Sequence, residues 1–138
     1  VYQHQLLVSF LNIPIVSNHI DLNLLSTSAL DNGVVDYIKQ KYMRPLAVSP
    51  LAGGRIEHGT DEQALKLRKK LNEMATKYDS NIESVAVAWL IKLGALPLIG
   101  TLEENRIQNI VDAFAIEMDH QDWYDLYNTT KPTPAVLD

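Results

Sequence analysis

Three short apolar segments that alternate with helical segments constrain the fold of this chain most. The apolar segments span residues 14–20, 45–49 and 96–99, and each is short enough to be a buried strand. Every link between two successive strands contains at least one helical segment. Such crossovers place strands parallel to one another, because a tight turn can join only antiparallel strands. The sequence therefore predicts an α/β fold with a parallel sheet.

The helical segments follow from apolar periodicity and from polar residues at their starts. Three expected capping boxes, in which Ser or Thr is followed three positions later by Glu or Gln, pair Thr60 with Gln63, Ser80 with Glu83, and Thr101 with Glu104. Asp119 is expected to cap the last helix, which carries Trp123, Leu126 and Tyr127. The expected helices before it span residues 5–11, 34–41, 60–78, 82–93 and 101–114.

The number of strands is too small for a closed structure. A parallel sheet must be covered on both faces or closed into a barrel, and three strands can close nothing. A (β/α)8 barrel typically takes about 250 residues, whereas this chain has 138. We therefore expect a partial (β/α)8 TIM barrel, with residues 1–138 forming a single incomplete domain. Its unpaired strand edges and uncovered apolar faces predict self-association, strand exchange or a complementing N-terminal chain.

Composition and charge exclude several classes of function. The net charge is −5 without any basic run, so neither nucleic acid nor a membrane surface is an expected partner. Cysteine is absent, and the four histidines show no metal-ligand spacing, so we expect no metal site. No apolar run approaches the roughly 20 residues that a membrane span needs, and the start does not resemble a signal peptide. We expect a cytoplasmic protein.

Two of the expected strands end in turns that suit an anion. Residues 44–55 read as a buried strand that runs into two adjacent glycines and an arginine, Gly53-Gly54-Arg55. The last strand ends in Gly100-Thr101, directly before a helix. Exposed backbone N–H groups in small-residue turns and at helix starts bind anions. Two such turns on successive strands predict one cradle for a phosphorylated cofactor, although the glycine turn alone is also compatible with a simple tight connection.

The same segments carry a likeness to a known family. The chain resembles the C-terminal half of an aldo-keto reductase, especially the bacterial oxidoreductases, from the helix before the sixth barrel strand to the C-terminal helices. The likeness rests on three segments in this order, namely VSNHIDL at residues 16–22, LAVSPLAGGR at 46–55 and PLIGTLEENRI at 97–107. It implies reversible hydride transfer between NADPH and an aldehyde or ketone, with the cofactor at the C-terminal mouth of the barrel.

The resemblance also implies which residues hold the phosphates. Ser49, Leu51, Gly53 and Arg55 would surround the pyrophosphate through backbone N–H groups and a guanidinium. Gly100 and Thr101 would open the helix that holds the adenosine phosphate. Arg106 would stack on the adenine or pair with the 2′-phosphate. Taken without the family, Arg106 fits either an ordinary solvated helix residue or a phosphate ligand.

Three residues depart from the family pattern. Val48 stands where a Tyr or Trp usually stacks on the nicotinamide. His19 replaces the Gln that usually binds the carboxamide, and is either a pH-sensitive substitute or a structural histidine. Gly100 stands where many members have Lys, so the grip on the 2′-phosphate would depend more on Arg106.

The family's catalytic Tyr, Lys, Asp and His come from the N-terminal half, and this chain offers no substitute. Tyr37 and Lys41 lie four residues apart on one helix face, but that helix is expected outside the barrel, far from its mouth. We therefore expect no catalytic residue and no activity from this chain alone. Two alternatives remain open: a non-catalytic remnant or interaction module with little cofactor affinity, and a half-barrel from another phosphate-binding barrel enzyme such as an isomerase.

Overall fold

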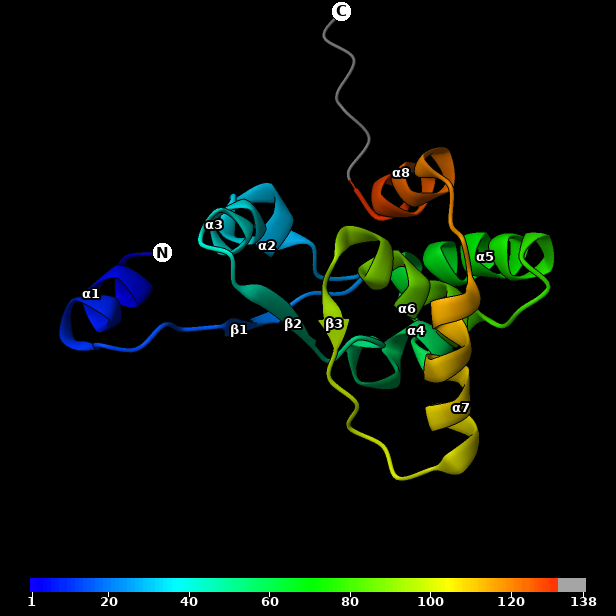
Figure 1. The fold of residues 1–138 in the computed structure, drawn as a ribbon. Coiled ribbons are helices and arrows are strands. Elements are labelled where there is room, and N and C mark those ends of the chain that lie inside the picture. Colours follow the sequence, from blue (N-terminus) through cyan, green and yellow to red (C-terminus); the bar gives the residue numbers. More distant parts are fainter. Residues whose placement is uncertain (132–138) are drawn as a thin grey trace, which may run out of the picture.

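The computed structural model describes residues 1–131 and confirms the α/β fold. Three parallel strands form one sheet in the order β1-β2-β3, which is also their order along the chain. The strands are β1 (Ser17–Asp21), β2 (Arg44–Val48) and β3 (Leu96–Pro97). The helices are α1 (Tyr2–Phe10), α2 (Ser28–Asp31), α3 (Val34–Gln40), η1 (Ala52–Gly54), α4 (Arg55–His58), α5 (Glu62–Lys77), α6 (Ile82–Leu93), α7 (Glu104–Asp112), η2 (Ala113–Ala115) and α8 (His120–Thr129). Figure 1 shows α5 to α8 gathered on one side of the sheet and α1 on the other side of the molecule.

The two faces of the sheet differ in cover. Along β2, Pro45 and Ala47 are buried, whereas Arg44 and Val48 are exposed and Leu46 is half-buried. Side chains alternate between the faces of a strand, so one face packs on helices and the other is open. The open face is continuous across the sheet, because His19, Leu46 and Leu96 are in register. A partial barrel has this asymmetry, since the open face corresponds to the interior of a closed barrel.

Helix α6 is the centre of the helical layer. Eight consecutive residues from Glu83 to Leu90 are buried, as expected for a helix that is covered on all sides. The indole rings of Trp89 on α6 and Trp123 on α8 stack with centroids 5.1 Å apart. Each indole N–H also donates to the other residue's carbonyl, at 3.2 Å and 3.0 Å. At 12 residues α6 is far too short to cross a membrane, and no helix within residues 1–131 is long and apolar enough to do so.

The predicted helices are present and α6 has its expected bounds, but none of the three predicted capping boxes forms. The N-cap of α5 is Asp61, whose carboxylate accepts from the Ala64 N–H, and the N-cap of α6 is Asn81. In both cases an Asx side chain next to the predicted Thr60 or Ser80 takes the cap, because a short acceptor in extended backbone reaches the free N–H groups best. Helix α7 begins at Glu104 without a side-chain cap. The fourth prediction is confirmed, since Asp119 caps α8.

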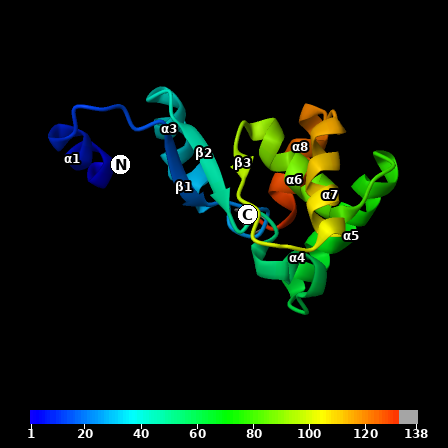
Figure 2. The same ribbon diagram turned by 60° about the horizontal axis from the view of Figure 1, so that its bottom comes forward.

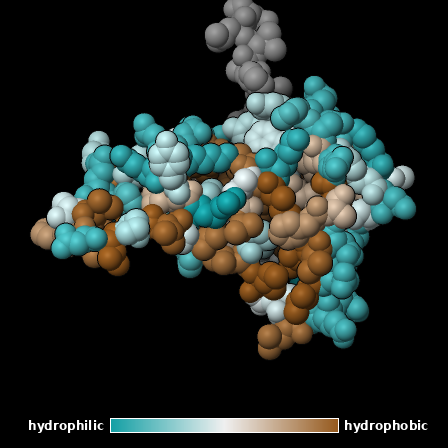
Figure 3. All heavy atoms as spheres, viewed as in Figure 1, coloured by the Kyte–Doolittle hydropathy of each residue, from teal (hydrophilic) through white to brown (hydrophobic). Residues whose placement is uncertain are grey.

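Helix α1 has its expected type but buries no residue. Leu6 and Phe10 are 63% and 77% exposed. A hydrogen bond of 2.9 Å between His4 Nδ1 and the Tyr37 hydroxyl joins α1 to α3. Figure 3 shows hydrophobic atoms gathered over α1 and, separately, around the ends of β2 and β3. The apolar face of α1 is therefore unused within residues 1–131.

Candidate functional site

A cleft of about 520 Å3 lies where β2 and β3 end. The chain leaving β2 and the chain leaving β3 run side by side there (Figure 2). The carboxyl ends of parallel strands meet at one edge of a sheet, and ligands commonly bind at that edge in α/β proteins. The cleft is lined by Val48, Ser49, Pro50, Leu51, Gly53, Gly54, Leu98, Ile99, Gly100, Thr101, Arg106 and Ile110.

The first wall of the cleft is a loop with an unusual backbone. Ser49 and Ala52 have φ of 52° and 53°, and Gly53 and Gly54 have φ of 61° and 87°. Each non-glycine residue in this left-handed region costs about 1–2 kcal/mol, so the loop is held by its surroundings. One of its supports is the Asn23 side chain in the loop after β1, whose amide donates to the Ser49 carbonyl at 3.1 Å.

The hydrogen bonds inside this loop decide which amides are free. The Ala52 N–H donates to Ser49 O at 2.8 Å, and the Gly54 N–H donates to Leu51 O at 3.1 Å. Within residues 1–131 the N–H groups of Ser49, Leu51 and Gly53 make no such bond. Alternating free amides in a turn with left-handed residues form a concavity that suits an anion. These three residues are, together with Arg55, the ones that the family resemblance implies around the pyrophosphate.

The second wall is the segment after β3. Leu98 still donates its N–H to Ala47 O of β2 at 2.9 Å, and the chain then turns away. The expected strand over 96–99 is therefore shorter, and its pairing with β2 ends at Leu98. The Thr101 hydroxyl accepts from the Glu103 N–H at 3.1 Å, in a local turn that precedes α7. Gly100 and Thr101 thus line the cleft without capping the helix.

Arg106 is the one side-chain cation among the residues that line this cleft. Its Nε donates to Glu83 Oε1 at 2.9 Å, and its Nη2 lies 2.9 Å from the same oxygen. The Glu83 side chain is only 9% exposed, and its Oε2 accepts from the Asn109 amide at 2.7 Å. The cation that the sequence assigns to a phosphate is therefore already paired with a nearly buried carboxylate.

Two predicted residues lie outside the cleft. Arg55 forms a bidentate pair with Asp61, with Nε and Nη2 at 2.9 Å and 2.7 Å from the two carboxylate oxygens. Hydrogen bonds from this guanidinium, with help from the Ala64 N–H, lower the pKa of Asp61 to about 2. His19 is exposed on the open sheet face, beside Leu46. The structure thus brings together six of the eight predicted residues, namely Ser49, Leu51, Gly53, Gly100, Thr101 and Arg106.

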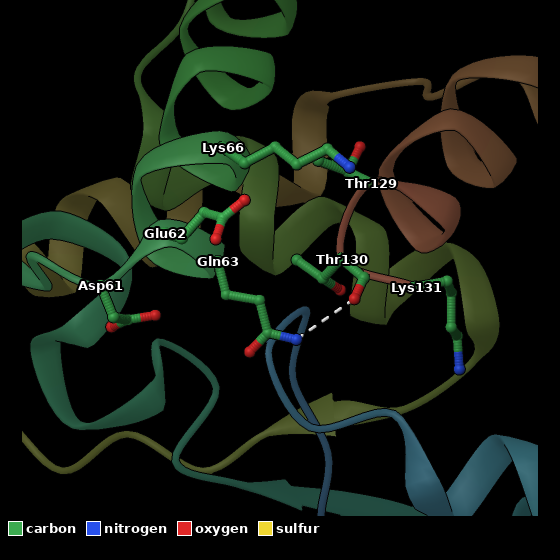
Figure 4. Close-up of a pocket in the computed structure, with 7 residues that line it drawn as sticks. All are labelled: Asp61, Glu62, Gln63, Lys66, Thr129, Thr130 and Lys131. Atoms are coloured by element: carbon green, nitrogen blue, oxygen red, sulfur yellow. Dashed lines mark hydrogen bonds between the residues drawn. The ribbon is translucent and has the colours of Figure 1, made fainter. Parts of the chain in front are cut away.

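A second hollow of about 520 Å3 lies between the start of α5 and the end of α8 (Figure 4). Gln63 crosses it and donates to the Thr130 carbonyl at 3.2 Å. Carboxylates and lysines line it together, so no single charge dominates its walls. No strand end is among the residues that border this hollow. We therefore place the candidate site at the β2 and β3 ends.

Sequence reasoning missed Glu83 and Asn109. The sequence assigns Glu83 to a capping box with Ser80, but the structure turns its carboxylate to α7. Residues 83 and 106 lie 23 positions apart, so no local spacing links them. The sequence of the helix alone gave a hint of this pair. A glutamate in the first turn of a mostly apolar helix needs a partner when that helix is buried. Among residues 1–131 no group of three or more His, Cys, Asp or Glu could hold a metal ion.

Comparison with known proteins finds relatives that match most of this chain. The 6-dehydroglucose reductase of Agrobacterium fabrum is 31% identical over 128 residues, which are 91% of this chain and 42% of that protein. The oxidoreductase YdhF of Escherichia coli is 31% identical over 125 residues, 88% of this chain and 41% of that protein. The chain thus spans less than half the length of these relatives.

Solved structures share the fold at lower identity. An aldo-keto reductase, AKR2E5, solved in complex with NADPH, superposes with a TM-score of 0.78 at 22% identity, over 94% of this chain and 39% of its own. The thermostable aldo-keto reductase Tm1743 gives a TM-score of 0.74 at 20% identity, over 91% of this chain and 43% of its own. The sequence model of the Aldo/keto reductase family matches residues 4–129. The chain belongs to the aldo/keto reductase family.

Proposed function

We propose that this chain is the cofactor-binding, C-terminal half of an NADPH-dependent aldo-keto reductase, whose residues 1–138 form one incomplete domain. The observation that carries the proposal is the shared cleft, where free amides of the β2 loop, the turn after β3 and Arg106 surround one space. A diphosphate is the ligand that such a space recognises best, because several backbone donors meet its oxygens without a large positive charge.

In this proposal the chain binds and orients the cofactor and does not carry out proton transfer. When bound, the nicotinamide cofactor supplies the hydride that passes to or from an aldehyde or ketone. Ser49, Leu51 and Gly53 hold the pyrophosphate, and the segment at Gly100 with Arg106 holds the adenosine end. The proton donor and its partners lie on the N-terminal half of the barrel, so the chain alone is inactive. Tyr37 does not serve, since it lies on α3 and is not among the residues that line the cleft.

In this proposal Arg55 needs a change of partner, and His19 needs the second half of the barrel. Arg55 would have to leave Asp61 to reach a pyrophosphate. His19 faces the open side of the sheet, which corresponds to the barrel interior, and would meet the nicotinamide carboxamide there. Val48 lines the cleft beside the strand end and gives the nicotinamide an aliphatic contact instead of an aromatic one.

The open sheet face supports a further part of the proposal, a complementing N-terminal half or a second copy of the chain. Leu96 and Ile99 are 40% and 47% exposed at the end of the sheet, and Leu102 is 99% exposed in the loop that follows. Their cover by strands would bury apolar surface and pair the sheet edges.

The test is a fluorescence titration of NADPH with the 138-residue chain. We expect saturable binding that Arg106→Gln weakens. Arg44→Gln is the matched control, because Arg44 is exposed at the amino end of β2, at the opposite edge of the sheet from the cleft. If both variants weaken NADPH binding equally, Arg106 contributes only through the net charge of the chain. Absence of saturable binding would leave the second candidate, an interaction module without cofactor, which the pairing of Arg106 with Glu83 and the open apolar face favour.

A further inference from the structure

The Glu83 carboxylate does not line the cleft, but it is hydrogen-bonded to Arg106, which does. Its negative charge offsets the positive charge of that guanidinium. The carboxylate is held on α6 by Arg106 on one oxygen and by Asn109 on the other. Asn109 is in turn fixed by Asn81, whose amide donates to its Oδ1 at 3.1 Å. The carboxylate therefore has a set position, and its charge opposes that of the cleft's only lining cation within the described residues.

The contacts leave part of Arg106 available. A guanidinium has five N–H donors, and the pair with Glu83 engages Nε and Nη2. Within residues 1–131 no contact engages Nη1. Arg106 can thus still donate to an anion in the cleft, but an anion that it meets also feels the carboxylate behind it. With ordinary hydrogen-bond lengths that carboxylate lies about 6 Å from the anion.

We propose that Glu83 sets the cofactor preference of the cleft, by offsetting the charge of Arg106 and so reducing the advantage of a 2′-phosphorylated dinucleotide over an unphosphorylated one. The inference rests on the proposed function, since it assumes that a dinucleotide occupies the cleft. NADPH differs from NADH only in the phosphate on its 2′-hydroxyl, and that phosphate brings all of the extra negative charge. Glu83 is a positioning residue here, because it acts through Arg106.

Glu83→Gln tests the proposal in the 138-residue chain. Glutamine keeps the length of the side chain and an oxygen that accepts from Arg106, and it removes one negative charge. Removing the Coulomb repulsion between this carboxylate and a phosphate dianion at about 6 Å in a watery cleft should then raise NADPH affinity roughly threefold to tenfold. NADH affinity should change much less. The measurement is the ratio of the two dissociation constants by fluorescence titration, which a merely structural role of Glu83 would not move.

Controls separate the pair from general charge. Glu104→Gln makes the same charge change at an exposed residue in the first turn of α7 and should leave the ratio nearly unchanged. In an Arg106→Gln background the 2′-phosphate loses the donor that holds it about 6 Å from Glu83, so Glu83→Gln should alter the ratio much less. Circular dichroism checks that each variant is folded. Should Glu83→Gln not fold, Glu83→Asp, which withdraws the carboxylate by one methylene, should move the ratio in the same direction by a smaller factor.

Each other outcome overturns the inference. Equal gains for NADPH and NADH would mean that Arg106 meets a group which both dinucleotides carry. A loss of NADPH affinity in Glu83→Gln would mean that orientation of Arg106 outweighs its charge. An unchanged ratio with saturable binding would remove Glu83 from cofactor selection but leave the proposed function standing. Absence of binding of either dinucleotide by the unaltered chain would end both.

Discussion

Gly53→Ala would show whether the loop after β2 owes its shape to backbone freedom or to crowding. Gly53 has φ of 61°, and a Cβ built there meets no atom within 4 Å. The substitution should therefore cost only the free energy of placing an L-residue in this backbone conformation. An L-residue in this region costs about 1–2 kcal/mol, and alanine returns about 0.4–1 kcal/mol by restricting the unfolded chain. The free energy of unfolding should fall by about 1 kcal/mol.

Gly33→Ala is the matched control for this change. Gly33 has φ of 77°, also with open space around a Cβ, but it precedes α3 and does not line the cleft. Urea unfolding followed by circular dichroism should give the same loss of stability for both variants, within about 0.5 kcal/mol. Only Gly53→Ala should weaken NADPH binding, because its methyl group lies beside a free amide of the cleft.

Two results would refute this reasoning. A much larger loss of stability for Gly53→Ala than for Gly33→Ala would mean that the loop is closely packed rather than open. Equal effects of the two variants on NADPH binding would mean that the loop after β2 does not contact the cofactor. Ala52→Gly gives the opposite perturbation, since φ of 53° strains the alanine, and should stabilise the fold by about 0.5 kcal/mol.

Trp89→Phe should lower the free energy of unfolding by about 2–3 kcal/mol, because it removes a hydrogen bond and part of a fully buried side chain. Trp123→Phe, at a half-buried residue, should cost less in the same urea assay. The reverse order would contradict the central place of α6. Asp61 has its pKa lowered to about 2 by Arg55, so its contribution to stability is present above pH ~4 and is lost as pH falls towards 2. Asp61→Asn should flatten urea midpoints measured over that range, and an unchanged slope would exclude the pair as its cause. Leu46→Asp, on the open sheet face, should shift size-exclusion elution towards the monomer; unchanged elution of an associated species would place the contact elsewhere.

The sequence predicts the elements and the site because both follow from local chemistry. Apolar segments bounded by Pro and Gly identify the strands, and the small-residue turns after β2 and β3 place the cleft. The capping residues were less predictable, since Asp61 and Asn81 stand next to the expected Thr60 and Ser80 and cap the helices instead. Adjacent Asx and hydroxyl residues compete for the same N–H groups, and sequence spacing does not decide between them.

Ion pairs between residues far apart in the chain could not be predicted from the sequence. Arg55 and Arg106 both carry the right chemistry for a phosphate, yet each meets a carboxylate of its own chain. Asp61 is close in sequence to Arg55, so that pair has a local signal. Glu83 reaches Arg106 only because α6 and α7 pack together. The sequence thus indicates which residues can bind an anion, while the packing determines how much of their charge remains.

The central claim is that one anion is held jointly by the strand ends of β2 and β3. The most direct measurement is an amide NMR titration of the 138-residue chain with NADPH. We predict that the N–H signals of Ser49, Leu51 and Gly53 shift together with those of Gly100 and Thr101, along one saturation curve. Shifts confined to the hollow between α5 and α8, or no saturable shift in either loop, would contradict the claim.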